Sequence, residues 1–335
     1  MKLRGTVDRM LLVTGGAGFI GSNLVAALND AGRSDVVVCD TLGHDGKWRN
    51  LAKRQLADIV PPGQIDAWLA GRELDAIFHL GAISETTATD GDLVVETNFR
   101  LSVRLLDWCT ANTVPFVYAS SAATYGDGAQ GFVDDPSLEA MKRLRPMNLY
   151  GWSKLLFDKL VAERAARRDP LPPQCVGLRF FNVFGPNEYH KGSMMSVLTK
   201  RFDDIRSGRD IQLFRSHRDG VADGDQRRDF IYIDDVIRVM LWLWKSPAVS
   251  GLFNVGTGEA RSFKEMMLAA YAALGAPPRI EYIDMPEAIR DSYQYFTQSD
   301  GERLRRAGYN GGFTSLEDSV SAYVSGYLNT ADRYR

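Results

Sequence analysis

Short, continuous apolar runs alternate with longer stretches of helical periodicity through the first half of the chain. The apolar runs lie at residues 10–14, 36–40, 76–80 and 116–120. None of them alternates strictly between apolar and polar positions, so each predicts a strand that is covered on both faces. The helical stretches lie at about 22–32, 92–112 and 148–168. This strand–helix–strand rhythm predicts right-handed crossovers and a parallel, doubly wound sheet.

The second half of the chain predicts further strands together with a smaller lobe. The expected strands lie at 176–181, 211–214, 230–233 and 253–256, with a helix at about 194–206. Asp234 and Asp235 are expected to cap the helix that follows. The polar stretch 215–226 predicts a solvated loop, and residues 262–335 predict two helices around a strand at 280–283. The predicted fold class is therefore α/β, a Rossmann-type doubly wound parallel sheet with a smaller C-terminal α/β substrate lobe.

Composition and charge exclude several classes of protein. The 335 residues include 40 Lys and Arg against 42 Asp and Glu, a net charge of −2, which leaves no basic excess for binding nucleic acid. No apolar run approaches the roughly 18 residues of a membrane span, and the charged start predicts no secretory signal. Cys39, Cys109 and Cys175 have no metal-ligand or redox spacing, so we expect buried free thiols, no metal site and a cytoplasmic protein.

A glycine-rich turn follows the first predicted strand. Residues 15–21 read Gly-Gly-Ala-Gly-Phe-Ile-Gly, with a helix predicted after them and Asp40 at the end of the next strand. Glycines allow the backbone to approach a pyrophosphate closely, and a helix N-terminus supplies free N–H groups and a positive dipole. The pattern therefore predicts a dinucleotide site that includes Gly15, Gly18 and Gly21, with a tight turn that binds nothing as the alternative.

The residues after Asp40 leave the choice of dinucleotide open. Asp40 can accept hydrogen bonds from an adenosine ribose, which favours NAD. Thr41, Lys47 and Arg49 follow closely, and a cation there can instead hold the 2′-phosphate of NADP.

Tyr150 and Lys154 form a Y-x-x-x-K pair at the start of a predicted helix. The i,i+4 spacing places both side chains on one face. A free tyrosine has a pKa of about 10, and an ammonium about 4 Å away contributes about 4 kcal/mol at an effective dielectric of about 20. We therefore expect Lys154 to lower the pKa of Tyr150 and make it a base, although such pairs are also common on solvated helices. Ser121, at the end of strand 116–120, can donate to a substrate oxygen, or it can simply cap a turn.

Together the glycine turn, the strand-end serine and the Y-x-x-x-K pair resemble an extended short-chain dehydrogenase/reductase of the nucleotide-sugar type. Within that group the chain is similar to the ADP-L-glycero-D-manno-heptose 6-epimerases, from about residue 10 to about residue 327. The stretches that carry this resemblance are Ile20-Gly21-Ser22-Asn23, Ala119–Gly126, Arg179–Pro186, His190-Lys191-Gly192-Ser193-Met194 and Phe296-Thr297-Gln298. The fourth and fifth of these are the most specific to the family.

The resemblance implies an isomerase of lipopolysaccharide inner-core precursor synthesis. It inverts C6″ of ADP-glycero-manno-heptose, from D-glycero to L-glycero, through a transient 6″-ketone formed with bound NADP, with NAD as the other option. Inversion requires acid/base groups on two faces of the sugar, and Tyr150 and Lys191 match them. Without the resemblance, the sequence predicts that Lys191 is a cation on a surface loop. The resemblance also implies a homo-oligomer, with a pentamer as one option, that has a nucleotide-sugar substrate and neither nucleic acid nor membrane as a partner.

Site residues carry over from the resemblance position by position. The cofactor positions are Gly15, Gly18, Phe19, Ile20, Gly21, Asp40, Thr41, Lys47, Leu80, Gly81, Ala82, Ile83, Ser84, Asn98, Lys154, Val183 and Lys191. The substrate positions are Ser121, Asn182, Ser193, Lys200, Phe214, Arg215, Ser216, His217, Arg228 and Tyr293. The implied domains are a dinucleotide-binding domain at 10–185, with sheet strands returning at about 227–258, and a nucleotide-sugar lobe formed by 186–226 and 259–330.

The chain departs from the family pattern at a few positions, and other functions compete. Lys200 replaces a frequent substrate-contacting His, Pro62 falls near a frequent Lys, and Val221–Gln226 is an insertion. A UDP-hexose 4-epimerase is the main alternative. A 4,6-dehydratase is disfavoured because Ala122 and Ala123 lie where its acid and base are expected. A dinucleotide-sensing binding protein without chemistry is the alternative from another class.

Overall fold

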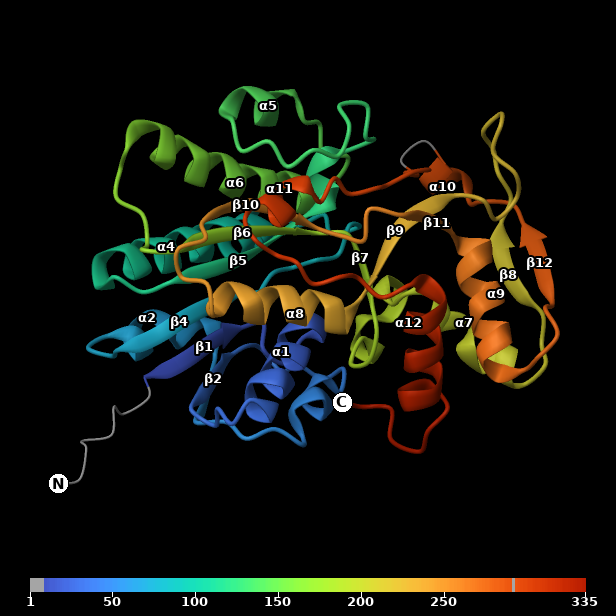
Figure 1. Ribbon diagram of the computed structural model, residues 1–335, viewed down its shortest axis with the longest axis horizontal. Helices are drawn as coiled ribbons and strands as arrows, with labels where there is room; N and C mark the ends of the chain where they lie inside the picture. The colour runs from blue at the N-terminus through green and yellow to red at the C-terminus, as the bar shows by residue number, and fades with distance from the viewer. Residues whose placement is uncertain (1–8, 291–292) are drawn as a thin grey trace.

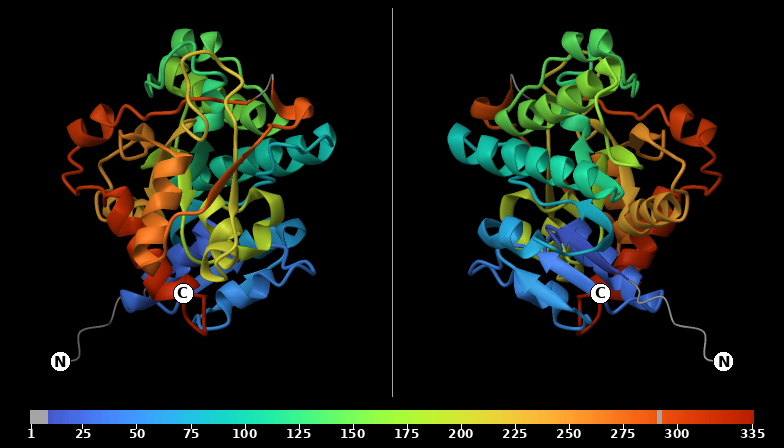
Figure 2. Two further views of the ribbon diagram at one scale, coloured as in Figure 1. Left: turned by 90° about the vertical axis from the view of Figure 1, so that its right-hand side faces the viewer. Right: turned by 90° about the vertical axis from the view of Figure 1, so that its left-hand side faces the viewer.

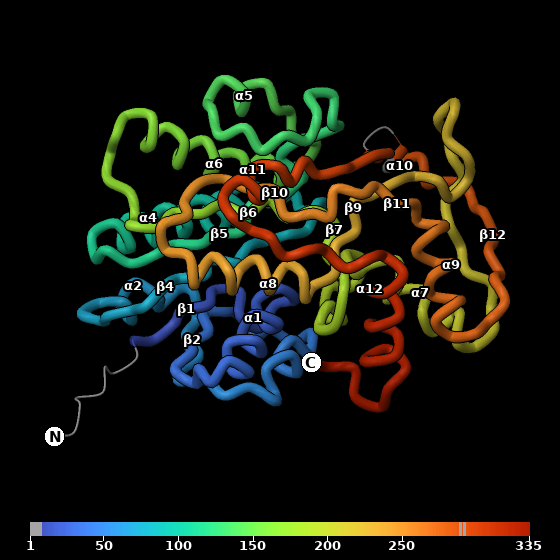
Figure 3. Tube along the Cα trace, in the orientation of Figure 1, coloured from blue at the N-terminus to red at the C-terminus, as the bar shows by residue number. Residues whose placement is uncertain are grey.

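The computed structural model describes residues 9–290 and 293–335, and its largest sheet has seven strands. Figures 1 and 3 show how the chain is arranged around it. The strand order is β10-β6-β5-β4-β1-β2-β3, and every neighbouring pair is parallel. The strands are β1 (Met10–Thr14), β2 (Val36–Cys39), β3 (Asp58–Val60), β4 (Leu74–His79), β5 (Phe116–Ser121), β6 (Cys175–Phe180) and β10 (Gly251–Val255). The predicted doubly wound parallel sheet is confirmed.

Helices cover both faces of this sheet, which explains why its strands are apolar throughout. Along β1, Leu11 and Val13 belong to one hydrophobic core while Leu12 belongs to the other. Helices α1 (Phe19–Asp30) and α8 (Ile233–Trp244) pack over the first face. Helices α2 (Ile65–Leu69), α4 (Leu101–Asn112) and α6 (Leu149–Arg167) contribute to the core on the second (Figure 1). A strand that buries both faces carries no polar alternation.

A smaller α/β lobe lies beyond the carboxyl ends of the strands, and the left view of Figure 2 shows it end-on. It contains a three-stranded sheet in the order β11-β9-β7 and a parallel pair, β12-β8. Its strands are β7 (Asn182–Phe184), β8 (Ile211–Phe214), β9 (Arg227–Tyr232), β11 (Ala260–Ser262) and β12 (Ile280–Ile283). Its helices are α7 (Val197–Arg206), α9 (Phe263–Leu274), α10 (Glu287–Arg290) and α12 (Leu316–Tyr323). The predicted smaller C-terminal α/β lobe is confirmed.

Shorter helices complete the described chain. They are α3 (Gly91–Val94), α5 (Leu138–Arg143) and α11 (Glu302–Arg306). Two π-helical segments, η3 (Val95–Arg100) and η6 (Val324–Leu328), extend neighbouring α-helices. The 3₁₀ turns are η1 (Lys47–Leu51), η2 (Pro62–Gln64), η4 (Ala122–Tyr125) and η5 (Tyr189–Met194). None of the helices in the described ranges combines the length and the apolar character that a bilayer crossing requires.

Two details of the second half were predicted wrongly. Strand β9 does not return to the large sheet but pairs with β7 and β11, and of the two strands expected at 227–258 only β10 rejoins it. A run of four apolar residues predicts a strand without specifying its partner. The region after residue 262 holds four described helices, not two, because α10 and α11 are too short to show helical periodicity. The domain boundaries themselves stay a prediction.

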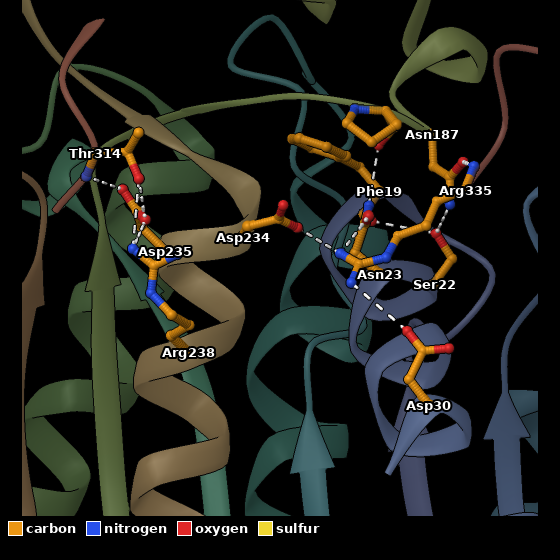
Figure 4. A network of polar contacts seen from close by, with 11 residues as sticks. Phe19, Ser22, Asn23, Asp30, Asn187, Asp234, Asp235, Arg238, Thr314 and Arg335 are labelled. Atoms are coloured by element: carbon orange, nitrogen blue, oxygen red, sulfur yellow. Dashed lines mark hydrogen bonds and ion pairs between the residues drawn. The ribbon is translucent and has the colours of Figure 1, made fainter. Parts of the chain in front are cut away.

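The expected caps of α8 are also corrected. The helix begins at Ile233, so Tyr232 occupies the N-cap position and Asp234 and Asp235 lie in the first turn. Asp235 is instead buried, where its carboxylate accepts hydrogen bonds from the N–H and hydroxyl of Thr314 at 2.8 and 2.9 Å (Figure 4). Carboxylates in a first turn still interact favourably with the helix dipole.

Candidate active site

A cleft of about 770 Å³ lies at the carboxyl ends of the parallel strands, between the sheet and the lobe. In doubly wound sheets this edge is where ligands bind. The predicted cofactor positions that line it are Gly15, Gly18, Phe19, Ile20, Gly21, Asp40, Lys47, Leu80, Gly81, Ala82, Ser84, Lys154, Val183 and Lys191. The other predicted positions that line it are Ser121, Tyr150, Asn182, Lys200, Phe214, Arg228 and Tyr293. The two groups expected to act on opposite faces of the sugar therefore share one cavity.

The glycine turn has the geometry of a dinucleotide cradle. Gly15 has a φ of +67°, and a Cβ there would lie 2.6 Å from the Gly81 nitrogen. A Cβ on Gly21 would lie 2.1 Å from the Gly15 carbonyl oxygen, so only glycine permits this crossing of helix and turn. Gly18 is the N-cap of α1 and offers no side-chain cap, which leaves the first-turn N–H groups facing the cleft without a side-chain acceptor. These residues fit the pyrophosphate of a dinucleotide.

Asp40 closes this part of the cleft. Its carboxylate accepts hydrogen bonds from the N–H groups of Ala17 and Thr41 and from the Lys47 ammonium, each at 2.8 Å. Lys47 therefore lies directly beside the group expected to bind the adenosine ribose. The Thr41 side chain, by contrast, is exposed and lies outside the cleft lining.

Helix α6 presents Tyr150 and Lys154 to the cleft. The Asn148 side chain caps the helix by accepting from the Gly151 N–H at 2.8 Å, which fixes the first turn. Ser121 lies at the end of β5, where its hydroxyl accepts from the Ala123 N–H at 3.1 Å and thus also caps a turn. The Ser121 side chain also acts on Tyr150, whose pKa it lowers. The functional and the turn-capping interpretations of Ser121 are therefore compatible.

The pKa of Tyr150 moves in the opposite direction from the one expected. Burial raises it, a hydrogen bond with Ser121 opposes this rise, and the charge of Asp158 adds to it. Burial also lowers the pKa of Lys154 to about 8, against the charge of Asp158. Burial thus reduces the charged fraction of Lys154, the group that was expected to stabilise a Tyr150 phenolate. A cationic nicotinamide is the further positive charge that would favour the phenolate.

A fully buried ion pair lies one helical turn behind Lys154. The side chains of Asp158 and Arg179 are both 0% exposed, and the Arg179 guanidinium approaches the Asp158 carboxylate to 2.9 Å. The hydroxyl of Ser120 donates to the same carboxylate at 2.9 Å. Asp158 therefore ties α6 to the ends of β5 and β6, which are the two strands beneath the reacting groups.

Asn98 acts from behind the cleft, outside its lining. It lies in the π-helical segment η3, where its side-chain oxygen accepts from the Ile83 N–H at 2.8 Å. Its amide nitrogen donates to the Ile83 carbonyl at 2.9 Å and to the Ser153 hydroxyl at 3.0 Å. Asn98 thus holds the 80–84 loop against α6. Its hydrogen bonds with Ile83 involve the Ile83 backbone only.

Lys191 lies on η5, above the start of α1. Its ammonium is 5.2 Å from the centroid of the Phe19 ring. Burial lowers its pKa, the charge of Glu188 opposes this change, and Lys200 adds to it. A lysine with a lowered pKa has a larger neutral fraction and can therefore accept a proton more readily at neutral pH.

The chain leading into η5 is tied to α1, a contact that the sequence did not predict (Figure 4). Asn23 donates to the Pro186 carbonyl at 2.9 Å, and Asn187 donates to the Ser22 hydroxyl at 3.0 Å. The backbone N–H of Arg335 donates to Asn187, and its guanidinium contacts Asp234 at 2.5 Å. The Ser22-Asn23 pair in the family motif therefore connects the dinucleotide helix to the loop of Lys191.

Arg228 is a buried cation on the lobe side of the cleft. It is buried between the rings of Tyr293 and Phe263, 5.3 and 5.5 Å from their centroids, and burial lowers its pKa. The described residues give it no carboxylate partner, and its guanidinium donates a hydrogen bond to the Arg227 carbonyl at 2.9 Å. A buried guanidinium that faces a cleft without a counter-charge suits an anionic ligand such as a diphosphate.

Four predicted substrate positions lie outside the cleft lining: Ser193, Arg215, Ser216 and His217. Ser193 offers its carbonyl to Lys200 at 2.9 Å. Arg215 faces Asp284 at 3.7 Å, and the His217 ring accepts from the Met285 N–H at 3.2 Å. These contacts fold the 215–217 stretch onto the lobe, so a substrate role for its residues stays a prediction.

Sequence reasoning missed several residues of the lining. They are Thr86, Met147, Asn148, His190, Met194, Met195, Ser196, Val197, Arg201, Gln212, Gln226, Phe263, Gln294 and Thr297, among others. Gln226 ends the stretch predicted to be solvated, yet it is buried and donates to the carbonyls of Phe214 and Arg215. The presence of Thr297 in a family-specific stretch was a usable signal, whereas nothing in the pattern marked Gln226.

The three cysteines are buried and free, as expected, and burial raises the pKa of Cys39 to about 12. Over the described part of the chain, no three or more His, Cys, Asp or Glu side chains gather as metal ligands.

Comparison with known proteins places this architecture in a family. The model of the NAD dependent epimerase/dehydratase family matches residues 11–256. The chain belongs to this family. Membership implies a nicotinamide cofactor, in agreement with the glycine cradle, and confirms that the chain is an epimerase-type Rossmann protein.

Two relatives and one solved structure in the family are particularly similar. An ADP-L-glycero-D-manno-heptose-6-epimerase of Nitratidesulfovibrio vulgaris (strain DP4) is 48% identical over 329 residues, covering 97% of this chain and 100% of the relative. A protein of the same name from Fusobacterium nucleatum is 39% identical over 335 residues, covering 97% and 100%. The crystal structure of the Helicobacter pylori ADP-L-glycero-D-manno-heptose-6-epimerase superposes with a TM-score of 0.78 at 29% identity, covering 95% and 96%.

Proposed function

We propose that this chain is an isomerase that inverts C6″ of ADP-glycero-manno-heptose, converting the D-glycero to the L-glycero form through a 6″-ketone. The product is a precursor of the lipopolysaccharide inner core. The observation that carries this proposal is that Tyr150 and Lys191 line one cleft together with the glycine cradle. Inversion moves hydride from one face of C6″ and returns it to the other, so the proton on the attached oxygen must be exchanged from two sides and a single acid/base group does not suffice. Family membership and the names of the similar relatives support the substrate class.

The residues of the chain divide the work as follows. The glycine turn and the first turn of α1 hold the dinucleotide, whose nicotinamide supplies a hydride acceptor and donor when bound. Tyr150, which lines the cleft together with Ser121, exchanges the proton of the sugar hydroxyl on one face, while Lys191 does so on the other. Arg228 and Lys200 supply positive charge toward the nucleotide diphosphate. Because the reaction is redox-neutral overall, the cofactor need not leave between turnovers.

A comparison of substrates tests this function. Purified protein loaded with dinucleotide is expected to convert ADP-D-glycero-D-manno-heptose into a mixture of the two C6″ epimers, as read by NMR, and to leave UDP-galactose unchanged. Conversion of UDP-galactose alone would instead establish the UDP-hexose 4-epimerase alternative. If neither sugar reacts while dinucleotide remains bound, the chain is a binding protein. Elimination is disfavoured because Ala122 and Ala123, which line the cleft near Ser121, offer no acid or base.

We infer that the preferred cofactor is NADP, because Lys47 lies beside Asp40 at the ribose end of the cleft. Lys47→Ala is expected to weaken NADP binding about ten- to a hundredfold, since a hydrogen bond to a charged group contributes about 1.5–3 kcal/mol. The affinity for NAD should change little. Fluorescence titration with both dinucleotides measures this difference, and Lys53→Ala, a lysine outside the cleft that pairs with Asp332, is the control. An equal loss for both dinucleotides would show that Lys47 does not recognise the 2′-phosphate.

A homo-oligomer stays a prediction, because the structure describes one chain only.

A further inference from the structure

Glu188 is a fully buried carboxylate that the mechanism above does not use. It lies between β7 and η5, three positions before Lys191, and its exposed fraction is 0%. An isolated buried carboxylate is costly unless its oxygens are hydrogen-bonded. The groups that are hydrogen-bonded to the Glu188 carboxylate therefore indicate its role.

The Glu188 carboxylate joins the two ends of the segment that carries Lys191. It accepts hydrogen bonds from the Ser196 N–H at 2.6 Å, the Ser196 hydroxyl at 2.7 Å and the Thr199 hydroxyl at 2.6 Å. Ser196 is the N-cap residue of α7, so the carboxylate grips the start of that helix. The Tyr323 hydroxyl, from α12, lies 3.4 Å away and is shared with Thr199. Residues 188–196 thus form a closed loop with both ends on one side chain.

The residues on either side of Glu188 fasten the loop to the rest of the molecule. Asn187 contacts Ser22 of α1, as Figure 4 shows, and the Tyr189 hydroxyl donates to the Arg333 carbonyl at 2.6 Å. The Lys191 N–H donates to the Glu188 carbonyl at 3.0 Å. Asn187 thus anchors the loop to the dinucleotide helix, whereas Glu188 anchors it to the lobe.

Several charged and titratable groups face the Lys191 amine from the elements packed around it. Glu188 and His190 lie on its own loop, and Lys200 lies on α7. Tyr189 and Tyr323, whose pKa values burial raises, lie near Glu188, and the Tyr189 hydroxyl donates to the Arg333 carbonyl. The Phe19 ring faces the amine from α1. Of the charges that affect Lys191, Glu188 is the one that opposes the lowering of its pKa by burial.

We propose that Glu188 is a positioning residue for the epimerisation, whose buried carboxylate fixes the Lys191 loop to α7 and places a negative charge in the same loop as the amine. This inference rests on the proposed function, in which Lys191 exchanges a proton with the sugar. It assigns Glu188 no contact with the substrate.

Glu188→Gln tests the proposal because it removes the charge and keeps a similar shape. The pKa of Lys191 should fall, since the group that raises it is lost, while desolvation and Lys200 remain. For the epimer on which Lys191 is the base, activity requires the neutral amine. The acidic limb of kcat/KM should therefore shift to lower pH. Thr199→Val removes one hydrogen-bond donor and keeps the charge, so it should lower kcat without shifting that limb.

A second readout does not depend on activity. NMR of ¹³C-dimethylated lysines, with the Lys191 signal assigned from Lys191→Arg, reports its titration in the purified protein. The Lys191 titration should shift to lower pH in Glu188→Gln. It should not shift in Glu317→Gln, the matched control, which removes a carboxylate of α12 that pairs with Arg261 outside the cleft.

The outcomes separate this inference from the function on which it rests. An unchanged Lys191 titration in Glu188→Gln overturns the inference, even if the enzyme is an epimerase. A uniform loss of kcat at every pH with no shift would reduce Glu188 to a structural role and also overturn it. If instead Lys191→Ala keeps wild-type activity, the proposed role of Lys191 fails, and the NMR shift still reports whether Glu188 balances its charge.

Discussion

Tyr150→Phe is expected to lower kcat about 10²–10⁴-fold, the usual contribution of a general acid or base. The phenylalanine keeps the ring at the start of α6 and loses only the hydroxyl. The fold should therefore persist. Bound dinucleotide should also persist, because the glycine cradle and Asp40 are not touched by this change.

The measurement is the rate of C6″ epimerisation, with the absorbance of copurified dinucleotide as the check on cofactor retention. Tyr282→Phe is the matched control, since that tyrosine lies on β12 outside the cleft lining. Wild-type rates in Tyr150→Phe would remove Tyr150 from the mechanism. Because burial raises the pKa of Tyr150, the phenol is expected to be protonated in the free protein across neutral pH, so its role as a base depends on bound cofactor.

Asp158→Asn is expected to destabilise the protein by about 3–5 kcal/mol, the usual consequence of removing one partner of a buried ion pair. Arg179 stays charged, is 0% exposed and would keep no counter-charge. The asparagine oxygen can still accept the hydrogen bond from Ser120. The loss of stability therefore measures the effect of removing the charge. Denaturant unfolding monitored by circular dichroism measures the effect.

The double variant Asp158→Leu with Arg179→Met supplies the control for this second prediction. It removes both charges and should recover much of the lost stability, because buried pairs are often replaceable by apolar residues. A loss below about 1 kcal/mol in Asp158→Asn would mean that the pair behaves like an exposed salt bridge. The charge of Asp158 also raises the pKa of Lys154, so Asp158→Asn should leave a larger neutral fraction of that lysine.

The large sheet was predictable because strands buried on both faces are apolar at every position. The runs at 10–14 and 116–120 coincide closely with β1 and β5. The partner of a short strand was not predictable, because pairing of β9 with β7 and β11 depends on contacts between segments distant in sequence. For the same reason the sequence predicts Asp235 to be a cap, whereas its carboxylate binds Thr314, 79 positions away.

The cofactor side of the cleft could be predicted from local pattern, since a turn that only glycine permits leaves a signature in sequence. Lys191 could not, because its place above Phe19 depends on the contacts of Asn187 and Glu188 with three separate helices. Its identification relied on family resemblance alone. The resemblance makes residues 215–217 substrate positions, yet Ser216 and His217 are held by Asp223, Tyr295 and Met285, which a local pattern does not reveal.

The π-helical segment that holds Asn98 also changes the direction in which the residues before it point around the helix axis. One extra residue in a turn rotates everything before it by about 100° relative to a regular continuation. Helix α3 can therefore direct its own face toward α6, while α4 keeps Leu105 and Leu106 against the sheet. A deletion that restored regular winding would strengthen backbone bonding and swing Asn98 off the Ile83 backbone. The π-helical segment thus lowers local helix stability, and in return it directs the Asn98 side chain at the Ile83 backbone.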